Sequence, residues 1–487
     1  MSGGVLQRSG SSMFEAIRSS GRTAIRQPDY WLLTIVLIMV MFGTVMVFSS
    51  SFAIGVREEG GDGYYFLTRH LIYLIIGLSG MLIAMSIDYH VWRKFALPGL
   101  LLVVGVLAIM IAFPSLAPEV FGASRWIQVG PIAFQPSEVA KLAMVLYLAA
   151  WLSSKGTRVR EFNYGLIPFG ILLGGLVGLV MLQPDLGTSM LLAMIGLSMF
   201  LVAGANLIHF GLFTSLGFST FLALALTADY RRDRILMFLN PDADLRNLGW
   251  QLAQAKLAIG SGGVFGVGLG ASHQKFAWLP AAHHDAIFAV IAEELGLMGA
   301  GFVLMLFIVL AWRGYQVAMR APDAFGSLIA VGIVTWIIAQ ASINIGGITT
   351  TIPFTGIPIP FISYGGSSLV ISLVAIGILL NISRQTIEPV NVRVTSNLKS
   401  TRSRVRRRAE PAGPVTAEPA TDSSSRNRLT RSGERERRPT PRPAPVTSGG
   451  GNRSREARAR GADSQGRTGG GTFGRGRTST ETSRRSR

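Results

Sequence analysis

Ten runs of apolar residues constrain the fold of this chain more than any other feature. Each run is close to the roughly twenty residues that an α-helix needs to cross the hydrocarbon core of a bilayer. Backbone N–H and C=O groups in lipid must hydrogen-bond to one another because water is absent, so such runs fold as helices. We therefore predict an all-α polytopic membrane protein with ten transmembrane helices. The runs cover residues 31–53, 70–87, 95–113, 137–154, 165–182, 187–206, 207–227, 286–311, 324–347 and 365–383.

The composition supports this prediction, since 49% of the residues are hydrophobic, 15% are charged and the mean hydropathy is +0.41. Such values largely exclude a soluble enzyme. The sequence contains no cysteine, which excludes disulfides, cysteine nucleophiles and thiolate metal sites. No apolar core and no cleavage site precede the run that begins near Trp31, so we expect an uncleaved first helix rather than a signal peptide.

Basic residues in the short loops indicate the orientation in the membrane. An even number of spans puts both termini on one side, and Lys and Arg mark the cytoplasmic side. The basic residues in loops that share a side with the termini are Arg93, Lys94, Lys155, Arg158, Arg160, Arg313 and Arg320. We therefore expect both termini in the cytoplasm and a large extracytoplasmic loop, about residues 228–284, between helices 7 and 8. This loop also contains six basic residues, but the charge rule weakens for long loops.

The chain ends in a basic tail. From Arg384 onward it holds 25 of the 46 Lys and Arg residues and nine of the 27 Asp and Glu residues. Its Arg, Ser, Gly, Pro and Thr composition cannot bury a core and is typical of disorder. We expect a cytoplasmic N-terminal segment (1–27), a membrane domain (28–386) and a disordered basic cytoplasmic tail (387–487). We expect the tail to contact anionic lipid or a protein partner rather than nucleic acid. The sequence shows no folded nucleic-acid-binding domain, and no aromatic residues are interleaved with the basic residues of the tail.

Four segments rich in Gly, Pro and polar residues emerge on the outer face under this topology. A protein that only anchored its tail would not need them there. Their clustering is therefore the main indication of function. The segments are residues 122–138, 183–188, 230–285 and 349–368.

The first two segments offer polar candidates. Glu138 and Lys141 are spaced i, i+3 on one helix face and can form either a structural salt bridge or a polar pocket for an anionic or hydroxylated headgroup. Arg125, next to a tryptophan, suits phosphate or sugar contact and equally suits an interfacial belt. Asp185 precedes a Leu-Gly-Thr sequence and, taken alone, is more typical of a helix cap than of a binding residue.

The third segment ends in His283, His284 and Asp285 at the start of the predicted eighth helix. A carboxylate buried at a cavity can act as a general base because poor solvation raises its pKa, and the structural alternative is a helix cap. Two adjacent histidines cannot both face one metal from a regular helix, so we expect no zinc site. The glycine-rich stretch 260–270 lacks the Lys-Ser/Thr ending of a P-loop, which favours close backbone packing over nucleotide binding.

The fourth segment reaches the predicted tenth helix through a polar, glycine-rich sequence. Backbone amides and hydroxyls at a helix N-terminus can bind an anion such as a pyrophosphate. No nucleotide motif accompanies them, so any energy source would lie in the substrate itself. The sequence is Ser363, Tyr364, Gly365, Gly366, Ser367 and Ser368.

These motifs resemble those of the SEDS family (shape, elongation, division and sporulation), over roughly residues 28–386. The stretch Ser272-His-Gln-Lys-Phe276 is more similar to the division members than to the elongation members, and the sporulation members share much of it. The motifs that carry the resemblance are Gln135-Pro-Ser-Glu-Val-Ala-Lys141, Gln183-Pro-Asp-Leu-Gly-Thr188, Gly260-Ser-Gly-Gly263, Leu279-Pro-Ala-Ala-His-His-Asp285 and Pro360-Phe-Ile-Ser-Tyr-Gly-Gly-Ser-Ser368.

The resemblance implies a peptidoglycan glycosyltransferase that polymerises lipid II on the outer face of the bacterial cytoplasmic membrane, at the division septum. It implies a class B penicillin-binding protein and other division proteins as partners. Asp285 matches the catalytic Asp of the family's His-Thr-Asp-Phe motif, although His284 and Ala286 replace the Thr and the Phe. This departure concerns local packing more than activity, because the Asp is retained.

The resemblance also implies a set of substrate contacts. Glu138 and Lys141 match polar positions that line the family's central cavity. Cationic groups would stabilise the leaving pyrophosphate, and a divalent cation, Mg²⁺ or Mn²⁺, is a further candidate for this role. The candidate substrate-binding residues are Glu138, Lys141, Arg125, Asp185, Lys275, Ser363, Gly365, Gly366 and Ser367.

Other functions compete with lipid II polymerisation at the division site. A lipid II flippase or another transporter would use Asp285 and Glu138 for gating, but transporters often carry inverted repeats. The only sign of such a repeat in the sequence is a weak similarity between Gln135-Pro-Ser and Gln183-Pro-Asp. A scaffold for division proteins would explain the tail but not the outer motifs, and an elongation-type polymerase is an alternative within the family.

Overall fold

The computed structural model describes residues 27–113, 125–129, 132–227, 232, 234, 236–238, 248–276 and 278–385. The predicted N-terminal segment, apart from Gln27, and the predicted basic tail lie outside these residues. A two-stranded antiparallel hairpin, β1 (Ile127–Val129) and β2 (Ile132–Phe134), precedes the helix α5. The helices are α2 (Tyr30–Glu58), α3 (Tyr65–Ser86), α4 (Tyr89–Ala112), α5 (Pro136–Lys155), α6 (Ile167–Leu182), α7 (Leu186–Val202), α8 (Leu207–Thr227), α10 (Leu248–Ser261), α11 (Ile287–Arg320), α12 (Ala324–Ile348) and α13 (Gly366–Arg384).

A helix occurs at the position of each predicted apolar run. Among the described residues, eight helical segments are long and apolar enough to cross a membrane, and α7 is a shorter apolar helix. The helix α5 is not among the eight and carries Glu138 and Lys141 near its start. A helical, multi-pass membrane fold is therefore confirmed, whereas the count of ten spans and the placement of the long loop stay predictions. That long connection is not irregular throughout, because it contains α10.

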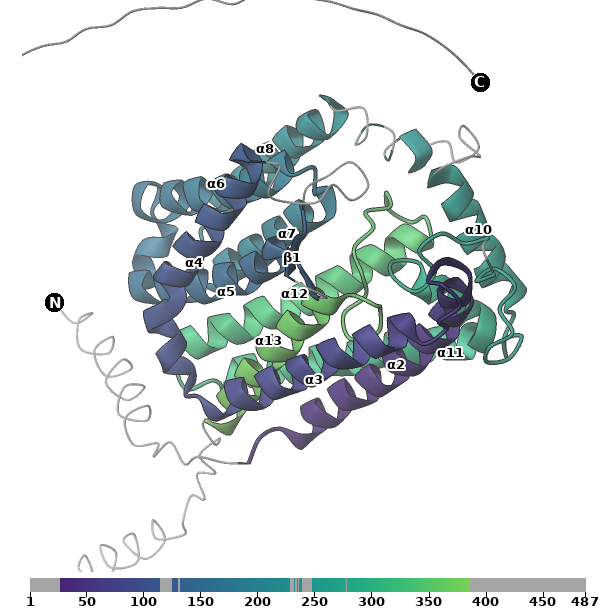
Figure 1. Ribbon diagram of the computed structural model, residues 1–487. Helices are drawn as coiled ribbons and strands as arrows, with labels where there is room; N and C mark the ends of the chain where they lie inside the picture. The colour runs from purple at the N-terminus through teal and green to yellow at the C-terminus, as the bar shows by residue number, and fades with distance from the viewer. Residues whose placement is uncertain are drawn as a thin grey trace, which may run out of the picture. The chain divides into compact units, whose positions relative to one another are not determined.

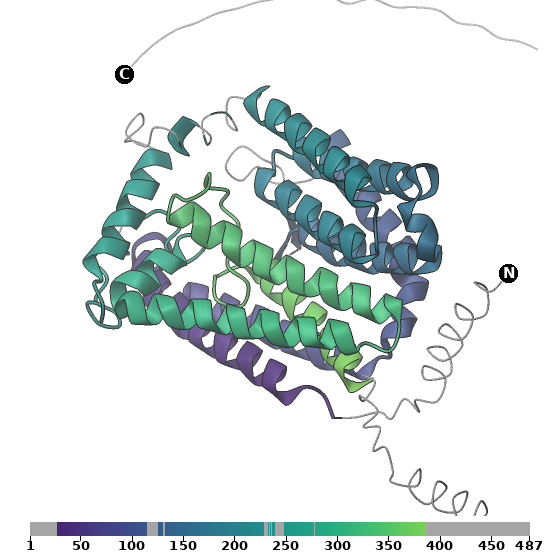
Figure 2. The same cartoon turned by 180° about the vertical axis from the view of Figure 1, so that it is seen from behind.

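The central helix of the bundle is α12, which packs against α5, α7, α11 and α13. Figure 1 shows it in the middle of the bundle, and Figure 2, from behind, shows neighbouring helices on either side of it. It carries Gln340 and Asn344, of which 0% and 2% are exposed. A buried amide is costly unless it is hydrogen-bonded, so these side chains must find polar partners within the bundle. Their partners lie in the candidate site.

Glycines allow the helices to approach closely where the packing is tightest. A methyl group at Gly377 of α13 would overlap the carbonyl of Met81 in α3, and one at Gly77 of α3 would lie 2.7 Å from Leu373. Helices in membranes associate through such small residues because lipid tails offer no hydrophobic drive between them. The pairing of α3 with α13 therefore depends on glycine at both surfaces.

The loop between α12 and α13, residues 349–365, folds back against α2. A methyl group at Gly43 of α2 would overlap the Phe361 carbonyl. The Phe361 side chain is 1% exposed, and its φ of 66° lies in the left-handed region, which a residue other than glycine seldom adopts. Packing thus fixes the backbone of a loop that supplies several candidate site residues.

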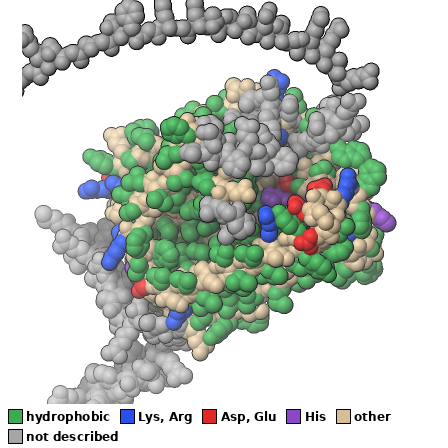
Figure 3. Space-filling view, viewed as in Figure 1, with side chains coloured by type: hydrophobic (Ala, Val, Ile, Leu, Met, Phe, Trp, Pro, Cys, Tyr) green, Lys and Arg blue, Asp and Glu red, His purple; other side chains and the backbone are tan. Residues whose placement is uncertain are grey.

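Charged side chains concentrate at the two ends of the described bundle, whereas hydrophobic side chains cover its middle (Figure 3). At one end, Asp29 lies 2.6 Å from Arg313. Asn381 of α13 accepts from the Tyr89 amide at 2.9 Å and donates to the Met85 carbonyl at 2.8 Å there. This end is thereby tied together by polar contacts, and the candidate site occupies the other end.

Candidate active site

The described parts of the four polar segments that the sequence singled out contact one another in the structure, whereas their place on the outer face stays a prediction. In Figure 3 acidic, basic and histidine side chains gather near the end where α10 lies in Figure 1. The contacts that join the segments are Arg125 to the carbonyls of Gln183 and Pro184, the Gln135 amide to Ser367 Oγ, and Arg234 to the carbonyl of Phe354.

The predicted pair of Glu138 and Lys141 forms in the first turns of α5. Lys141 Nζ lies 2.7 Å from Glu138 Oε2 and donates to Gln340 Oε1 at 2.8 Å. It also lies 4.8 Å from the centre of the Trp336 ring. The Lys141 side chain is 1% exposed, and a buried ammonium needs such partners to offset the loss of water. The pair holds α5 to α12 inside the bundle.

Gln340 connects Lys141 to the loop before α13. Its Oε1 also accepts from the Trp336 indole at 2.8 Å. Its Nε2 donates to the Pro358 carbonyl at 2.9 Å and to Ser368 Oγ at 3.2 Å. A single amide therefore links Lys141 in α5 to the loop and to the first turn of α13.

Asp285 lies in the turn before α11, and the N-cap residue of that helix is Ala286, so Asp285 does not occupy the N-cap position itself. Backbone amides of Asp285 and Ala286 bond to its carboxylate. Asp285 is 9% exposed, and Gln251 Nε2 lies 3.5 Å from its Oδ1. Burial raises the pKa of Asp285, and nearby His284 and Arg234 together with backbone hydrogen bonds oppose that rise. The carboxylate is thus a stronger base than an exposed one.

The backbone at Gly356 closes the space beside this carboxylate. A methyl group there would lie 3.3 Å from Asp285 Oδ2 and 3.7 Å from Arg234 Nη1. The φ of Gly356 is 72°, which glycine adopts without strain. Glycine therefore lets the loop backbone approach the Asp285 and Arg234 side chains together.

Asn344, one turn beyond Gln340 in α12, fixes the peptide unit of Asp285. Its Nδ2 donates to the Asp285 carbonyl at 2.7 Å and to the Ile357 carbonyl at 2.6 Å. The side chain uses both of its donor hydrogens on carbonyls from two separate segments. Asn344 therefore positions the start of α11 against the loop before α13.

His283 packs between two aromatic rings. The ring centres lie 4.5 Å from Phe66 and 5.4 Å from Tyr364. Burial lowers the pKa of His283 to about 3, so its imidazole is neutral at physiological pH. Tyr364 donates its backbone amide to the His283 carbonyl at 2.9 Å. The aromatic contacts join the Asp285 turn to α3 and to the loop before α13.

Asp185 caps α7, as its sequence context predicts. Its Oδ1 accepts from the Thr188 amide at 3.1 Å, and its Oδ2 accepts from Gln135 Nε2 at 3.3 Å. Arg125 donates from Nε to the Gln183 carbonyl at 2.9 Å and from Nη2 to the Pro184 carbonyl. These contacts bind the hairpin before α5 to the turn between α6 and α7.

The hydroxyls before and within α13 bond inside the protein. Ser363 Oγ accepts from the Ile359 amide at 2.8 Å, and Ser367 Oγ donates to the Ala133 carbonyl at 3.1 Å. Gly365 precedes the first residue of α13, and a methyl group at Gly366 would overlap the Tyr73 ring. The serines thus hold the loop and hairpin in place, and the backbone at the helix start remains the candidate anion contact.

Lys275 belongs to a separate buried cluster with the glycine-rich stretch. Its Nζ lies 2.7 Å from Glu294 Oε1 and donates to Ser49 Oγ at 3.1 Å. The stretch packs on the broken helix α11, where Gly296 has φ of 66°. A methyl group at Gly262 would overlap the Ala292 carbonyl, which accords with the close backbone packing expected there. The structure gives Lys275 a role in holding this loop.

No group of three or more His, Asp or Glu side chains suited to a metal ion occurs among the described residues. The divalent cation, Mg²⁺ or Mn²⁺, stays a prediction.

Sequence reasoning missed four residues around Asp285 and Lys141. Gln340 and Asn344 carried a usable signal, because polar residues in an apolar span face the bundle interior by default. The other two are Arg234 and Gln251. They lie in the long connection, and local sequence spacing does not show that this connection packs beside the start of α11.

The fold defines a multi-pass membrane protein with a buried polar cluster at one end of its helical bundle. The chain belongs to the family of FtsW, RodA and SpoVE, described as "Cell cycle protein", whose family model matches residues 30–388. This result confirms the SEDS resemblance.

Named relatives agree with this family. The chain is 42% identical over 358 residues to stage V sporulation protein E of Bacillus subtilis, covering 73% of this chain and 97% of that protein. It is 41% identical over 371 residues to a probable peptidoglycan glycosyltransferase FtsW of Trichlorobacter lovleyi, covering 76% of this chain and 96% of that protein.

Solved structures share the fold. A chain of a peptidoglycan synthase complex that coordinates polymerisation and crosslinking matches with a TM-score of 0.60 and 27% identity, covering 73% of this chain and 98% of that chain. The rod shape determining protein RodA of Thermus thermophilus matches with a TM-score of 0.55 and 27% identity, covering 74% of this chain and 98% of that chain.

Proposed function

We propose that this chain polymerises lipid II into glycan strands on the outer face of the bacterial cytoplasmic membrane. Its class as a peptidoglycan glycosyltransferase accords with its family and with its FtsW relatives. The observation that carries the proposed mechanism is the buried carboxyl of Asp285 beside Arg234, where the polar segments meet. Asn344 holds the backbone carbonyl of the same residue.

In the proposed reaction Asp285 accepts the proton from the 4-hydroxyl of the acceptor GlcNAc. The resulting oxygen attacks the anomeric carbon of the donor sugar, and the bond from that carbon to undecaprenyl pyrophosphate breaks. The pyrophosphate leaves with the bonding electrons. The amides at the start of α13 and the cations Arg125 and Lys141 are the proposed contacts for substrate and leaving group.

The proposal extends to topology and partners. Ten spans would place both termini in the cytoplasm and the polar site outside, where lipid II presents its sugars. A class B penicillin-binding protein would crosslink the strands, in keeping with the similarity to a chain of a peptidoglycan synthase complex. Similarity to FtsW proteins supports action with the division proteins at the septum.

Strand synthesis by the purified full chain tests the proposal. The chain is assayed together with its class B penicillin-binding protein, whose transpeptidase is blocked, and compared with Asp285→Ala. We expect long glycan strands from the wild type and none from the variant. Lipid II flipping without strand synthesis by the wild type would contradict the proposal and favour a transporter.

A further inference from the structure

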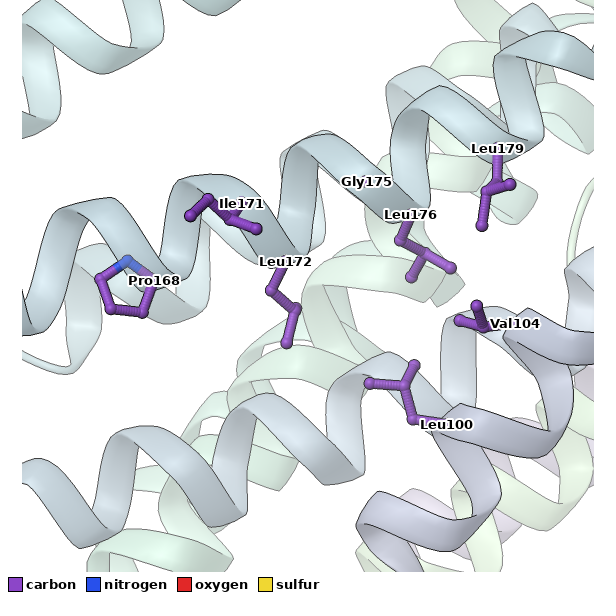
Figure 4. A pocket seen from close by; sticks show the side chains of 8 residues that line it. All are labelled: Leu100, Val104, Pro168, Ile171, Leu172, Gly175, Leu176 and Leu179. Atoms are coloured by element: carbon purple, nitrogen blue, oxygen red, sulfur yellow. The ribbon is translucent and has the colours of Figure 1, made fainter.

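A groove between α4 and α6 lies outside the proposed site. It has a volume of about 640 Å³. Figure 4 shows side chains of both helices pointing into it. The residues that define it are Leu100 and Val104 of α4 and Ile171, Gly175, Leu176 and Leu179 of α6. All of them are apolar, so the groove suits a hydrocarbon chain.

The groove has a notch that fits a methyl-branched chain. Ile171, Gly175 and Leu179 are spaced i, i+4 and i+8, so they form one ridge along α6. The glycine interrupts this ridge, and a methyl group added at Gly175 would meet no described atom within 4 Å. A glycine in a membrane helix normally packs against a neighbouring helix, but no described helix covers Gly175.

The groove leads to the polar end of the protein. Gln183 lies one turn, about 6 Å, beyond Leu179 and donates from Nε2 to the carbonyl of Leu107 in α4 at 3.3 Å. Arg125 binds the Gln183 carbonyl at 2.9 Å and brings positive charge to this end. An amphiphile in the groove would therefore place an anionic headgroup beside Arg125 and the candidate site.

We infer that the α4/α6 groove binds the isoprenoid tail of the lipid-linked substrate. This inference rests on the proposed function and adds a binding site for the part of the substrate that remains in the bilayer. The lining from residue 168 to 179 extends about 16 Å along α6, roughly half of the hydrocarbon thickness. It holds one section of the tail next to the headgroup, and the rest lies among lipids.

Filling the notch tests the inference. We compare Gly175→Leu with Gly174→Leu, a neighbouring position in α6 that also has open space but does not line the groove. Each full-length protein, with its class B penicillin-binding protein, polymerises lipid II carrying either the natural tail or a short tail. We expect Gly175→Leu to raise KM about tenfold for the natural tail only, through lost apolar contact. Gly174→Leu should match the wild type with both substrates.

Photocrosslinking supplies a measurement that does not need activity. A lipid II analogue with a photoreactive isoprenoid tail should label peptides of α4 and α6, and undecaprenyl phosphate should reduce this labelling more than phosphatidylglycerol does. Equal competition by the two lipids would overturn the inference, because the groove would then hold any bilayer lipid. Wild-type kinetics for Gly175→Leu with both tails would also overturn it, whereas a wild type without polymerisation would refute the proposed function instead.

Discussion

Replacing Asn344 by leucine should disable the site while leaving most of the bundle in place. Leucine has a similar size but cannot donate to the carbonyls of Asp285 and Ile357, which now lie 2.7 and 2.6 Å from Nδ2. Each buried carbonyl left without a donor costs about 1–3 kcal/mol, so the two together cost about 2–6 kcal/mol. If the loss raises the activation free energy of glycosyl transfer by about 3 kcal/mol, kcat falls roughly 150-fold.

Asn381→Leu is the matched control for this substitution. Asn381 is also buried and uses its amide on the backbone of Tyr89 and Met85, but at the opposite end of the bundle. Both variants should unfold at lower temperature than the wild type. Strand synthesis per folded molecule should fall only for Asn344→Leu. Equal activity of the two variants, or an active Asn344→Leu, would refute the positioning role.

Further substitutions test the charges of the site. The positive charge of Arg234 lowers the pKa of Asp285 against the effect of burial, so Arg234→Gln should raise that pKa. Because the base works deprotonated, the acidic limb of the kcat/KM profile should move to higher pH, and an unchanged limb would argue against Asp285 as the titrating base. Lys141→Met should destabilise the protein by about 3–5 kcal/mol, since it leaves Glu138 buried without its partner. The double variant Lys141→Met with Glu138→Gln should recover part of this stability in thermal unfolding. If the two substitutions lower the stability additively, the two side chains are not coupled.

The sequence predicts much of the fold because helix formation in lipid depends on local apolarity. All ten apolar runs are helical, and the i, i+3 spacing of Glu138 and Lys141 gives their contact at 2.7 Å. The cap at Asp185 follows from its neighbours in the chain in the same way. Such features involve residues within one or two turns of each other, so a linear pattern suffices to find them.

Contacts between distant segments could not be predicted in this way. Asn344 contacts Asp285, which is 59 positions away in the sequence. Lys275 contacts Ser49, which is 226 positions away. Lys275 was a candidate for the leaving group because of its charge alone, and only the packing of the glycine-rich stretch on α11 reveals its partner Glu294. Ser367 was a candidate anion contact for a similar reason, since its backbone partners, Ala133 and Gln135, come from another segment.

The central claim is that Asp285 is the base for glycan polymerisation. Asp285→Asn tests it most directly, because the amide keeps the size of the carboxylate but cannot take the proton. Single-turnover strand synthesis should fall by about 10²–10⁴-fold, and thermal stability should not fall, since the variant removes a charge that burial disfavours. Strand synthesis at the wild-type rate by a fully folded Asp285→Asn protein would contradict the account.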